Sequence, residues 1–178
     1  MRAPTDLHPD DRKARLALRD LLVSYRNEAG YSQACLARQV GVSQAAIARF
    51  EVREPLRITP AWRIADALGM RLVMYPDGLP GGPYDSADLD VLRPSDPASA
   101  AVWDRRQLKE SLAAARRACG HTQASLARLL DTTENALGEF ERATDSLLFG
   151  SPQRYCRALG GYLWIGVEIV RPATAVAA

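Results

Sequence analysis

The sequence of 178 residues predicts a mainly α-helical chain built from two copies of one small module. Three observations lead to this prediction. A segment of 21 residues recurs after 90 positions, apolar residues follow helical spacing within it, and Gly, Pro, Ser or Thr residues stand where the helices should begin or end. A mainly helical chain of this length has room for two small domains.

The repeat relates residues 31–51 to residues 121–141, and eight of the 21 positions are identical. Further downstream the spacing becomes 91, where Ala67-Leu68-Gly69 matches Ala158-Leu159-Gly160. A stretch rich in Pro and Gly separates the copies and is typical of an irregular linker. We therefore expect an N-terminal arm at 1–14, a first domain at 15–75, a linker at 76–101, a second domain at 102–171 and a tail at 172–178.

The first copy predicts four helices followed by a strand. Ser32 and Ser43 are good N-caps, Gly41 permits a left-handed turn between two short helices, and Pro60 suits a first helical turn. Gly30 and Gly69 mark helix ends. The expected elements are helices over 15–27, 33–40, 44–50 and 59–68 and a strand over 71–75.

Composition excludes several classes of protein. The net charge is +2, and 25% of residues are charged. No apolar run reaches the roughly 20 residues of a membrane-spanning helix. Three cysteines without a CxxC pair, and two histidines, argue against a disulfide scaffold or a zinc site. Without a Gly-rich phosphate loop or a nucleophile signature, we expect no enzyme, no cofactor and no metal, in a reducing cytoplasm.

Two short helices around a glycine turn indicate a helix-turn-helix. The pattern QxxLAxxxGVSQxxIxxxE over residues 33–51 resembles the Cro and phage-repressor (XRE) family. The following ITPAWRIADALGMRLVMYPDG, residues 58–78, is similar to HipB-type antitoxin–repressors of bacteria and phages. The resemblance implies two tandem lambda-repressor-like domains of the five-helix type. Each would end in a short strand that pairs with the other.

The resemblance further implies a sequence-specific regulator of double-stranded DNA, and most simply a repressor. The second helix of the motif would enter the major groove. There Gln44 could pair with adenine, Arg49 with guanine, and the Ala45 methyl could meet thymine. Net charge over residues 15–75 is +4, which suits this function. The expected DNA-binding residues of the first copy are Gln33, Arg38, Ser43, Gln44, Ala45, Ala48, Arg49, Arg53 and Arg57.

An arginine and a glutamate recur in both copies and are similar to an internal ion pair of the family. We expect Arg26 to pair with Glu51, and Arg116 with Glu141, as braces of the fold. A phosphate contact by Arg26 is the alternative. Three other positions could be redox sensors but suit small buried side chains better, namely Cys35, Cys119 and Cys156.

The second copy departs from the family pattern in its turn and on its reading helix. Asp131 stands at the position of Gly41, and Gly138 weakens the helix. Either this copy reads a cytosine-bearing half-site through a glutamate, or it serves only in assembly. Its candidate DNA-binding residues are Gln123, Thr133, Glu134, Asn135, Glu139 and Arg142.

Both expected strands are too apolar to remain solitary edges. Pairing within one chain would give a pseudo-dimer with two unlike reading heads, and pairing between chains would give a homodimer. The residues expected to pair are Leu72, Val73, Met74, Leu163, Trp164, Ile165 and Val167. A second class of function remains open: an antitoxin or adaptor that binds a toxin protein, its partner, and autoregulates its operon.

Overall fold

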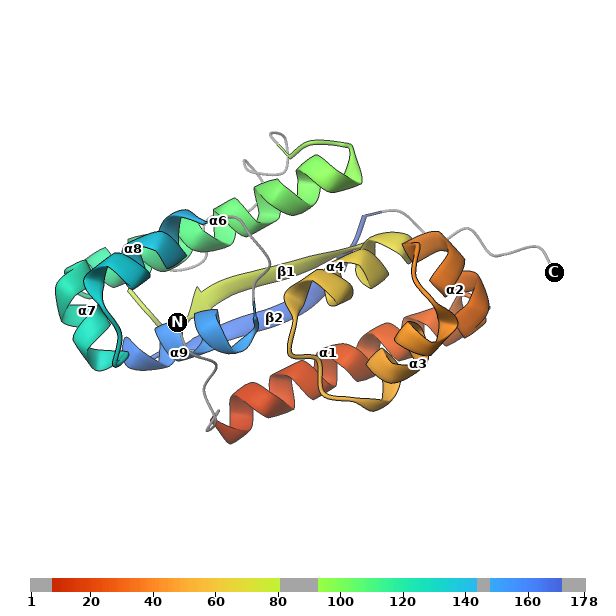
Figure 1. Cartoon of the computed structure of the whole chain (residues 1–178), viewed down its shortest axis with the longest axis horizontal. Helices are drawn as coiled ribbons and strands as arrows, with labels where there is room; N and C mark the ends of the chain where they lie inside the picture. Colours follow the sequence, from red (N-terminus) through yellow and green to blue (C-terminus); the bar gives the residue numbers. More distant parts are fainter. Residues whose placement is uncertain (1–7, 81–92, 144–147, 171–178) are drawn as a thin grey trace. The chain divides into compact units, whose positions relative to one another are not determined.

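A computed structural model of the chain describes residues 8–80, 93–143 and 148–170. These residues form two compact units, as drawn in Figure 1. The first unit holds residues 8–73 and 165–170, and the second unit holds residues 74–164. The prediction of a mainly helical protein is confirmed, because helices make up most of the described chain in both units.

The first unit contains four helices, α1 (Pro9–Glu28), α2 (Gln33–Val40), α3 (Gln44–Val52) and α4 (Ile58–Ala67). Helix α3 packs against α1 and α2, and α4 packs against the same two helices (Figure 1). The apolar stripe of each helix supplies the core of this unit, in which the side chains with the least exposure include Leu22, Leu36, Ile47, Ile58 and Trp62.

The second unit contains α6 (Pro97–Ala118), α7 (Gln123–Leu129), α8 (Glu134–Arg142) and α9 (Gly150–Ala158). Helix α8 packs against α6 and α7, and α9 packs against α6. Its core is formed by side chains at matching helical positions, including Leu108, Leu112, Leu126, Leu137 and Tyr155. The described residues of each unit thus hold four helices rather than the five expected from the resemblance. In the first unit, Gly69 ends α4 in a left-handed conformation and the chain then extends directly into a strand.

One two-stranded antiparallel sheet joins strand β1 (Met70–Asp77) to strand β2 (Tyr162–Ile169). In the first unit, the Val170 amide donates to the Gly69 carbonyl at 3.0 Å, and Arg71 lies 3.9 Å from Glu168. In the second unit, the rings of Tyr75 and Trp164 stack with their centroids 4.9 Å apart. Side chains along β1 alternate between buried and half-buried positions, which is the pattern of a strand with one face on a core.

The strand residues expected from the sequence all lie in this sheet. Leu72 and Met74 are buried, as is Leu163, whereas the others are half-buried. Both strands belong to the same chain.

Two helices begin earlier than the apolar pattern does. Helix α1 includes residues 9–14 of the expected arm, and α6 includes residues 97–101 of the expected linker. Both helices start with Pro in the first turn, and Asp96 caps α6 by accepting a hydrogen bond from the Ser99 amide at 2.9 Å. Strand β1 likewise extends to Asp77. The remainder of the linker, 81–92, and the tail, 172–178, lie outside the described residues.

Candidate nucleic-acid interface

The turn between α2 and α3 is closed at each end by local hydrogen bonds. The Ser32 hydroxyl accepts from the Cys35 amide at 3.1 Å, and the Ser43 hydroxyl accepts from the Ala46 amide at 3.2 Å. Between them Gly41 has φ +70°, the left-handed conformation that glycine adopts without a steric penalty. The expected bounds of α2 are those observed, and α3 extends two residues beyond its expected end at Phe50.

Helix α3 exposes the side chains that the sequence places on its outward face. Ser43, Gln44, Ala45 and Arg49 are exposed, and Ala48 is half-buried. On the opposite side Ile47 is only 2% exposed and fixes the helix to the core. An amide, a methyl group and a guanidinium therefore project from one short helix, a set that can read the edges of adenine, thymine and guanine.

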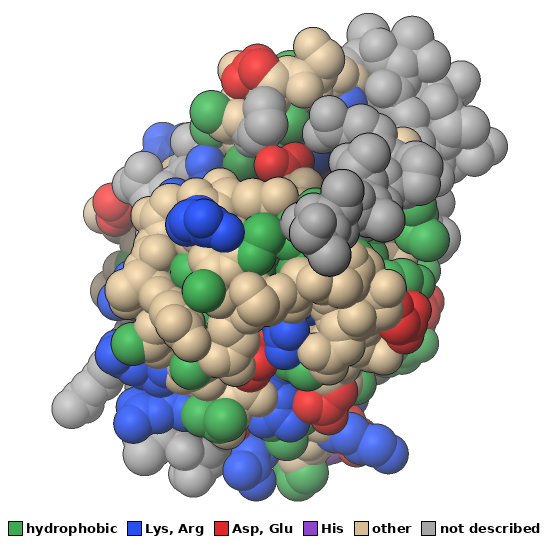
Figure 2. Space-filling model, turned by 90° about the vertical axis from the view of Figure 1, so that its right-hand side faces the viewer, with side chains coloured by type: hydrophobic (Ala, Val, Ile, Leu, Met, Phe, Trp, Pro, Cys, Tyr) green, Lys and Arg blue, Asp and Glu red, His purple; other side chains and the backbone are tan. Residues whose placement is uncertain are grey.

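Arginines flank this helix on both sides in the chain. Arg38 is exposed on α2, and Arg53 and Arg57 are exposed in the loop between α3 and α4. Figure 2 looks onto the end of the molecule at which α2 lies in Figure 1, and shows basic side chains gathered on the lower part of that face with acidic ones among them. The basic groups are suited to phosphate contacts, which fix register.

A network of buried polar groups holds α1, α2 and α3 of the first unit together. Arg26 donates to both carboxylate oxygens of Glu51, at 2.5 and 3.1 Å, and to the Tyr31 carbonyl at 2.7 Å. Gln33 donates its side-chain amide to Glu51 at 2.7 Å. The side chains of Arg26 and Gln33 are thus both engaged within the fold, and a contact of Gln33 with DNA stays a prediction. The nitrogen end of the Gln33 side chain is turned into the fold, because the carboxylate of Glu51 attracts it more strongly than solvent does.

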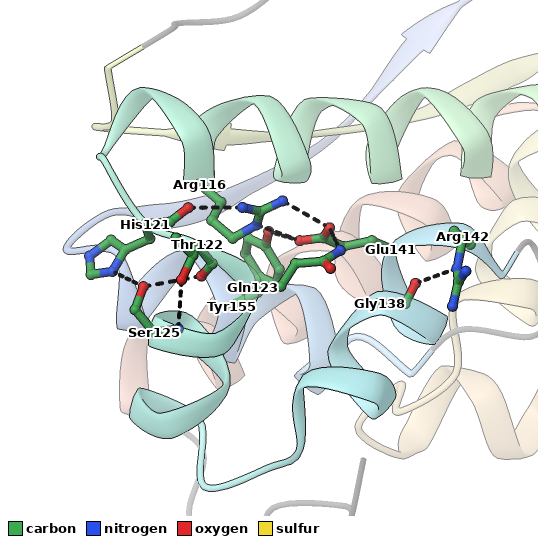
Figure 3. A network of polar contacts seen from close by, with 9 residues as sticks. All are labelled: Arg116, His121, Thr122, Gln123, Ser125, Gly138, Glu141, Arg142 and Tyr155. Atoms are coloured by element: carbon green, nitrogen blue, oxygen red, sulfur yellow. Dashed lines mark hydrogen bonds and ion pairs between the residues drawn. The ribbon is translucent and has the colours of Figure 1, made fainter.

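The second unit contains the same network with one addition (Figure 3). Arg116 donates to Glu141 at 2.8 and 3.1 Å and to the His121 carbonyl at 2.8 Å, and Gln123 donates to Glu141 at 2.8 Å. The Tyr155 hydroxyl also donates to Glu141 at 2.5 Å. Burial raises the pKa of Glu141, but the hydrogen bonds from Arg116, Tyr155 and Gln123 outweigh it and hold that pKa below its usual value.

The outward face of α8 differs in charge from that of α3. Thr133, Glu134, Asn135 and Glu139 are exposed. Gly138, which the pattern places on this face, is instead buried, because it packs close to the Gln123 side chain. Arg142 folds back along its own helix and donates to the Gly138 carbonyl at 3.0 Å. The face of α8 therefore presents two carboxylates where α3 presents Gln44 and Arg49.

The turn between α7 and α8 carries a backbone strain that the first unit avoids. Asp131 has φ +51°, and among the described residues it is the one non-glycine residue with a positive φ. Replacing Asp131 with Gly should raise the free energy of unfolding by about 0.5–1 kcal/mol, because glycine adopts this conformation without the steric cost of a side chain. Urea unfolding followed by circular dichroism measures the change, and a loss of stability would contradict this account of the turn.

Three contacts of structural importance were not anticipated from the sequence. Arg63 donates to the carbonyl of Val40, the last residue of α2, at 2.5 Å, and Arg154 donates to the carbonyl of Leu130, the C-cap of α7, at 2.9 Å. Arg63 and Arg154 stand 91 positions apart, which is the spacing of the repeat in this region, so the repeat could have revealed that they correspond. Tyr155 had no such signal, because Ile64 stands at the matching position.

Comparison with known protein families supports the motif. A family model described as a helix-turn-helix matches residues 22–73, which contain α2, α3 and α4. This match supports a DNA-binding transcription regulator of the XRE type. No curated protein and no solved structure matches the chain.

The described part of the chain lacks the features of a membrane span and of a metal site. No helix there is both long and apolar enough to cross a membrane. The described residues also contain no group of three or more His, Cys, Asp or Glu side chains placed to hold a metal ion. All three cysteines are outside disulfides, with Cys156 buried and the other two half-buried.

Proposed function

We propose that the chain is a sequence-specific regulator that binds double-stranded DNA and represses transcription by occupying a promoter. The observation that carries the proposal is the joint exposure of Gln44, Ala45 and Arg49 on α3. This helix lies in a motif braced by the buried pair Arg26–Glu51 and within the segment that matches the helix-turn-helix family. A rigid helix with outward base-reading groups is what recognition in the major groove requires.

The repeated bonds support the further proposal that the two units are copies of one module. Arg116, Gln123 and Glu141 reproduce the bonding of Arg26, Gln33 and Glu51, and Thr122 and Thr133 cap helices as Ser32 and Ser43 do. In this proposal the pairing of β1 with β2 makes one chain a pseudo-dimer. The two helices that face outward in this pseudo-dimer, α3 and α8, would differ in charge, since α8 exposes Glu134 and Glu139.

We assign DNA reading principally to α3. The exposed Glu134 and Glu139 on α8 oppose the approach of phosphates, and Arg142 is engaged with a backbone carbonyl of its own helix. A glutamate that accepts a hydrogen bond from cytosine would be the way for α8 to read bases. An asymmetric binding site in which one half contains cytosine would support that role.

The acidic face of α8 favours a second candidate function, that of an antitoxin-like adaptor which binds a toxin protein. Exposed carboxylates suit a basic protein surface better than they suit DNA. Recovery of a neighbouring gene product at a fixed ratio with the purified chain would support this function. Loss of that complex on changing Glu134 and Glu139 to Gln would assign it to α8.

Arg49→Ala tests the proposed reading of DNA. We expect about a 5- to 150-fold loss of affinity for the selected site, equivalent to about 1–3 kcal/mol, and a relaxed preference at one guanine position. Affinity for a set of duplexes with single base changes measures both effects at one salt concentration. Arg106→Ala, an exposed arginine paired with Glu110 on α6, is the matched control. An equal loss on every duplex would assign Arg49 to the phosphate backbone instead.

A further inference from the structure

An arginine is completely buried in the first unit, and it joins α1 to the loop that follows α3. Arg15 has an exposure of 0%, and its guanidinium donates to Glu54, with the Nε atom 3.1 Å from the nearer oxygen. A second nitrogen of the same guanidinium contacts that oxygen as well. From one turn earlier, Arg12 donates to the other oxygen of Glu54 at 2.9 Å. One carboxylate is thus held from both sides by α1.

Glu54 lies in the short segment that connects α3 to α4. This loop, residues 53–57, has Arg53 at one end and Arg57 at the other, both exposed. Between them Pro55 is buried, so that the loop is fixed by an apolar contact and by the carboxylate of Glu54. The two exposed guanidiniums therefore project from a segment whose centre is tied down.

The charge of Glu54 would otherwise oppose an anion in this region. Burial raises the pKa of Glu54, but hydrogen bonds and charge from Arg15 and Arg12 more than offset it, so the carboxyl is ionised at neutral pH. Two cations surround this single negative charge. The negative charge of Glu54 is therefore compensated by the guanidiniums that hold it.

We propose that Arg15 and Arg12, through Glu54, are positioning residues that set the loop 53–57 so that Arg53 and Arg57 contact the phosphate backbone of bound DNA. The inference rests on the proposed function and adds residues to it that lie on α1, outside the helix-turn-helix itself. Arg15 does not touch DNA, because it is buried. Its effect on binding passes through the conformation of the loop.

The test is the salt dependence of DNA binding by the double variant Arg15→Met/Glu54→Met. Removing both charges avoids leaving either Arg15 or Glu54 buried without the other. Circular dichroism checks that the variant folds before binding is measured. The probe is a 20-base-pair duplex of random sequence, whose binding depends on phosphate contacts. We expect the slope of log K against log salt to shrink by about 1–2, since each lost phosphate contact contributes about 0.9.

Two reference variants make the result specific. Arg53→Ala/Arg57→Ala removes the proposed contacts directly, and adding it to the anchor variant should produce little further loss of slope. Arg19→Met/Asp20→Asn removes an ion pair of the same net charge from α1 and should leave the slope unchanged. If the anchor variant fails to fold, Glu54→Asp takes its place, because it shortens the side chain that holds the loop while keeping a negative charge opposite Arg15.

The outcomes separate this inference from the proposed function. A folded anchor variant that keeps the native slope and affinity overturns the positioning role alone. A native chain without salt-dependent binding to the duplex overturns the proposed function, and the inference falls with it. The inference would also be overturned if Arg53→Ala/Arg57→Ala reduced the slope as much in the anchor variant as in the native chain. The anchor would then act through contacts other than those of Arg53 and Arg57.

Discussion

Glu141→Ala is expected to lower the free energy of unfolding by about 3–5 kcal/mol, the usual cost of removing one partner from a buried ion pair. Glu141 accepts hydrogen bonds from Arg116, Gln123 and Tyr155, and the side chains of the pair with Arg116 are only 8% and 7% exposed. The variant leaves the Arg116 guanidinium buried without its counter-charge. Urea unfolding at pH 7 measures the loss.

Two controls distinguish this effect from a general sensitivity of α8. Glu139→Ala changes an exposed carboxylate on the same helix and should alter stability by less than about 0.5 kcal/mol. Arg116→Met/Glu141→Met removes both charges and should recover much of the stability that Glu141→Ala loses. Equal stability of Glu141→Ala and the native chain would contradict the bracing role.

The pH dependence of stability should be dominated near neutrality by Lys109. This side chain is 2% exposed, lies 3.2 Å above the Phe140 ring and donates to the Phe140 carbonyl. Burial lowers its pKa from 10.5 to about 7, partly offset by the charge of Glu141. Between these two values the unfolded chain binds a proton that the folded chain has lost. Stability must therefore rise with pH across this window.

The expected size is about 3 kcal/mol between pH 6.5 and 9.5, from about 1.36 kcal/mol for each pKa unit. It is measured as the difference in pH dependence between the native chain and Lys109→Met, because methionine has no proton to exchange. The variant should also be the more stable protein at pH 6.5. Parallel profiles for the two proteins would show that Lys109 stays charged in the fold.

Local sequence signals predicted the helix-turn-helix motif well. Helix α2 has the bounds that Ser32 and Gly41 indicate, because a cap and a left-handed glycine fix a helix end within a few residues. The outward positions of α3 follow from helical periodicity once its start is known. Exposure of Gln44, Ala45 and Arg49 was therefore predictable from the sequence alone.

Contacts between distant segments were harder to predict. The bond of Arg15 to Glu54 joins residues 39 positions apart, and no repeat or motif marks it. Helices α1 and α6 also begin with mostly polar residues. A prediction based on apolar spacing therefore missed about six residues at the start of α1 and about five at the start of α6. Both helices have Pro in the first turn, and an acidic residue follows it in α1 and caps the helix in α6. These residues stabilise the N-terminus of a helix without adding to its apolar stripe.

Selection of bound sites from a random duplex library, with the native chain and Gln44→Ala/Arg49→Ala in parallel at near-physiological salt, tests the central proposal most directly. The account predicts an enriched motif for the native chain, with adenine and guanine preferences that the variant loses. An asymmetric motif would support two unlike heads in one chain, and a palindrome would indicate a homodimer reading through α3. Failure of the native chain to enrich any motif would contradict sequence-specific reading by α3.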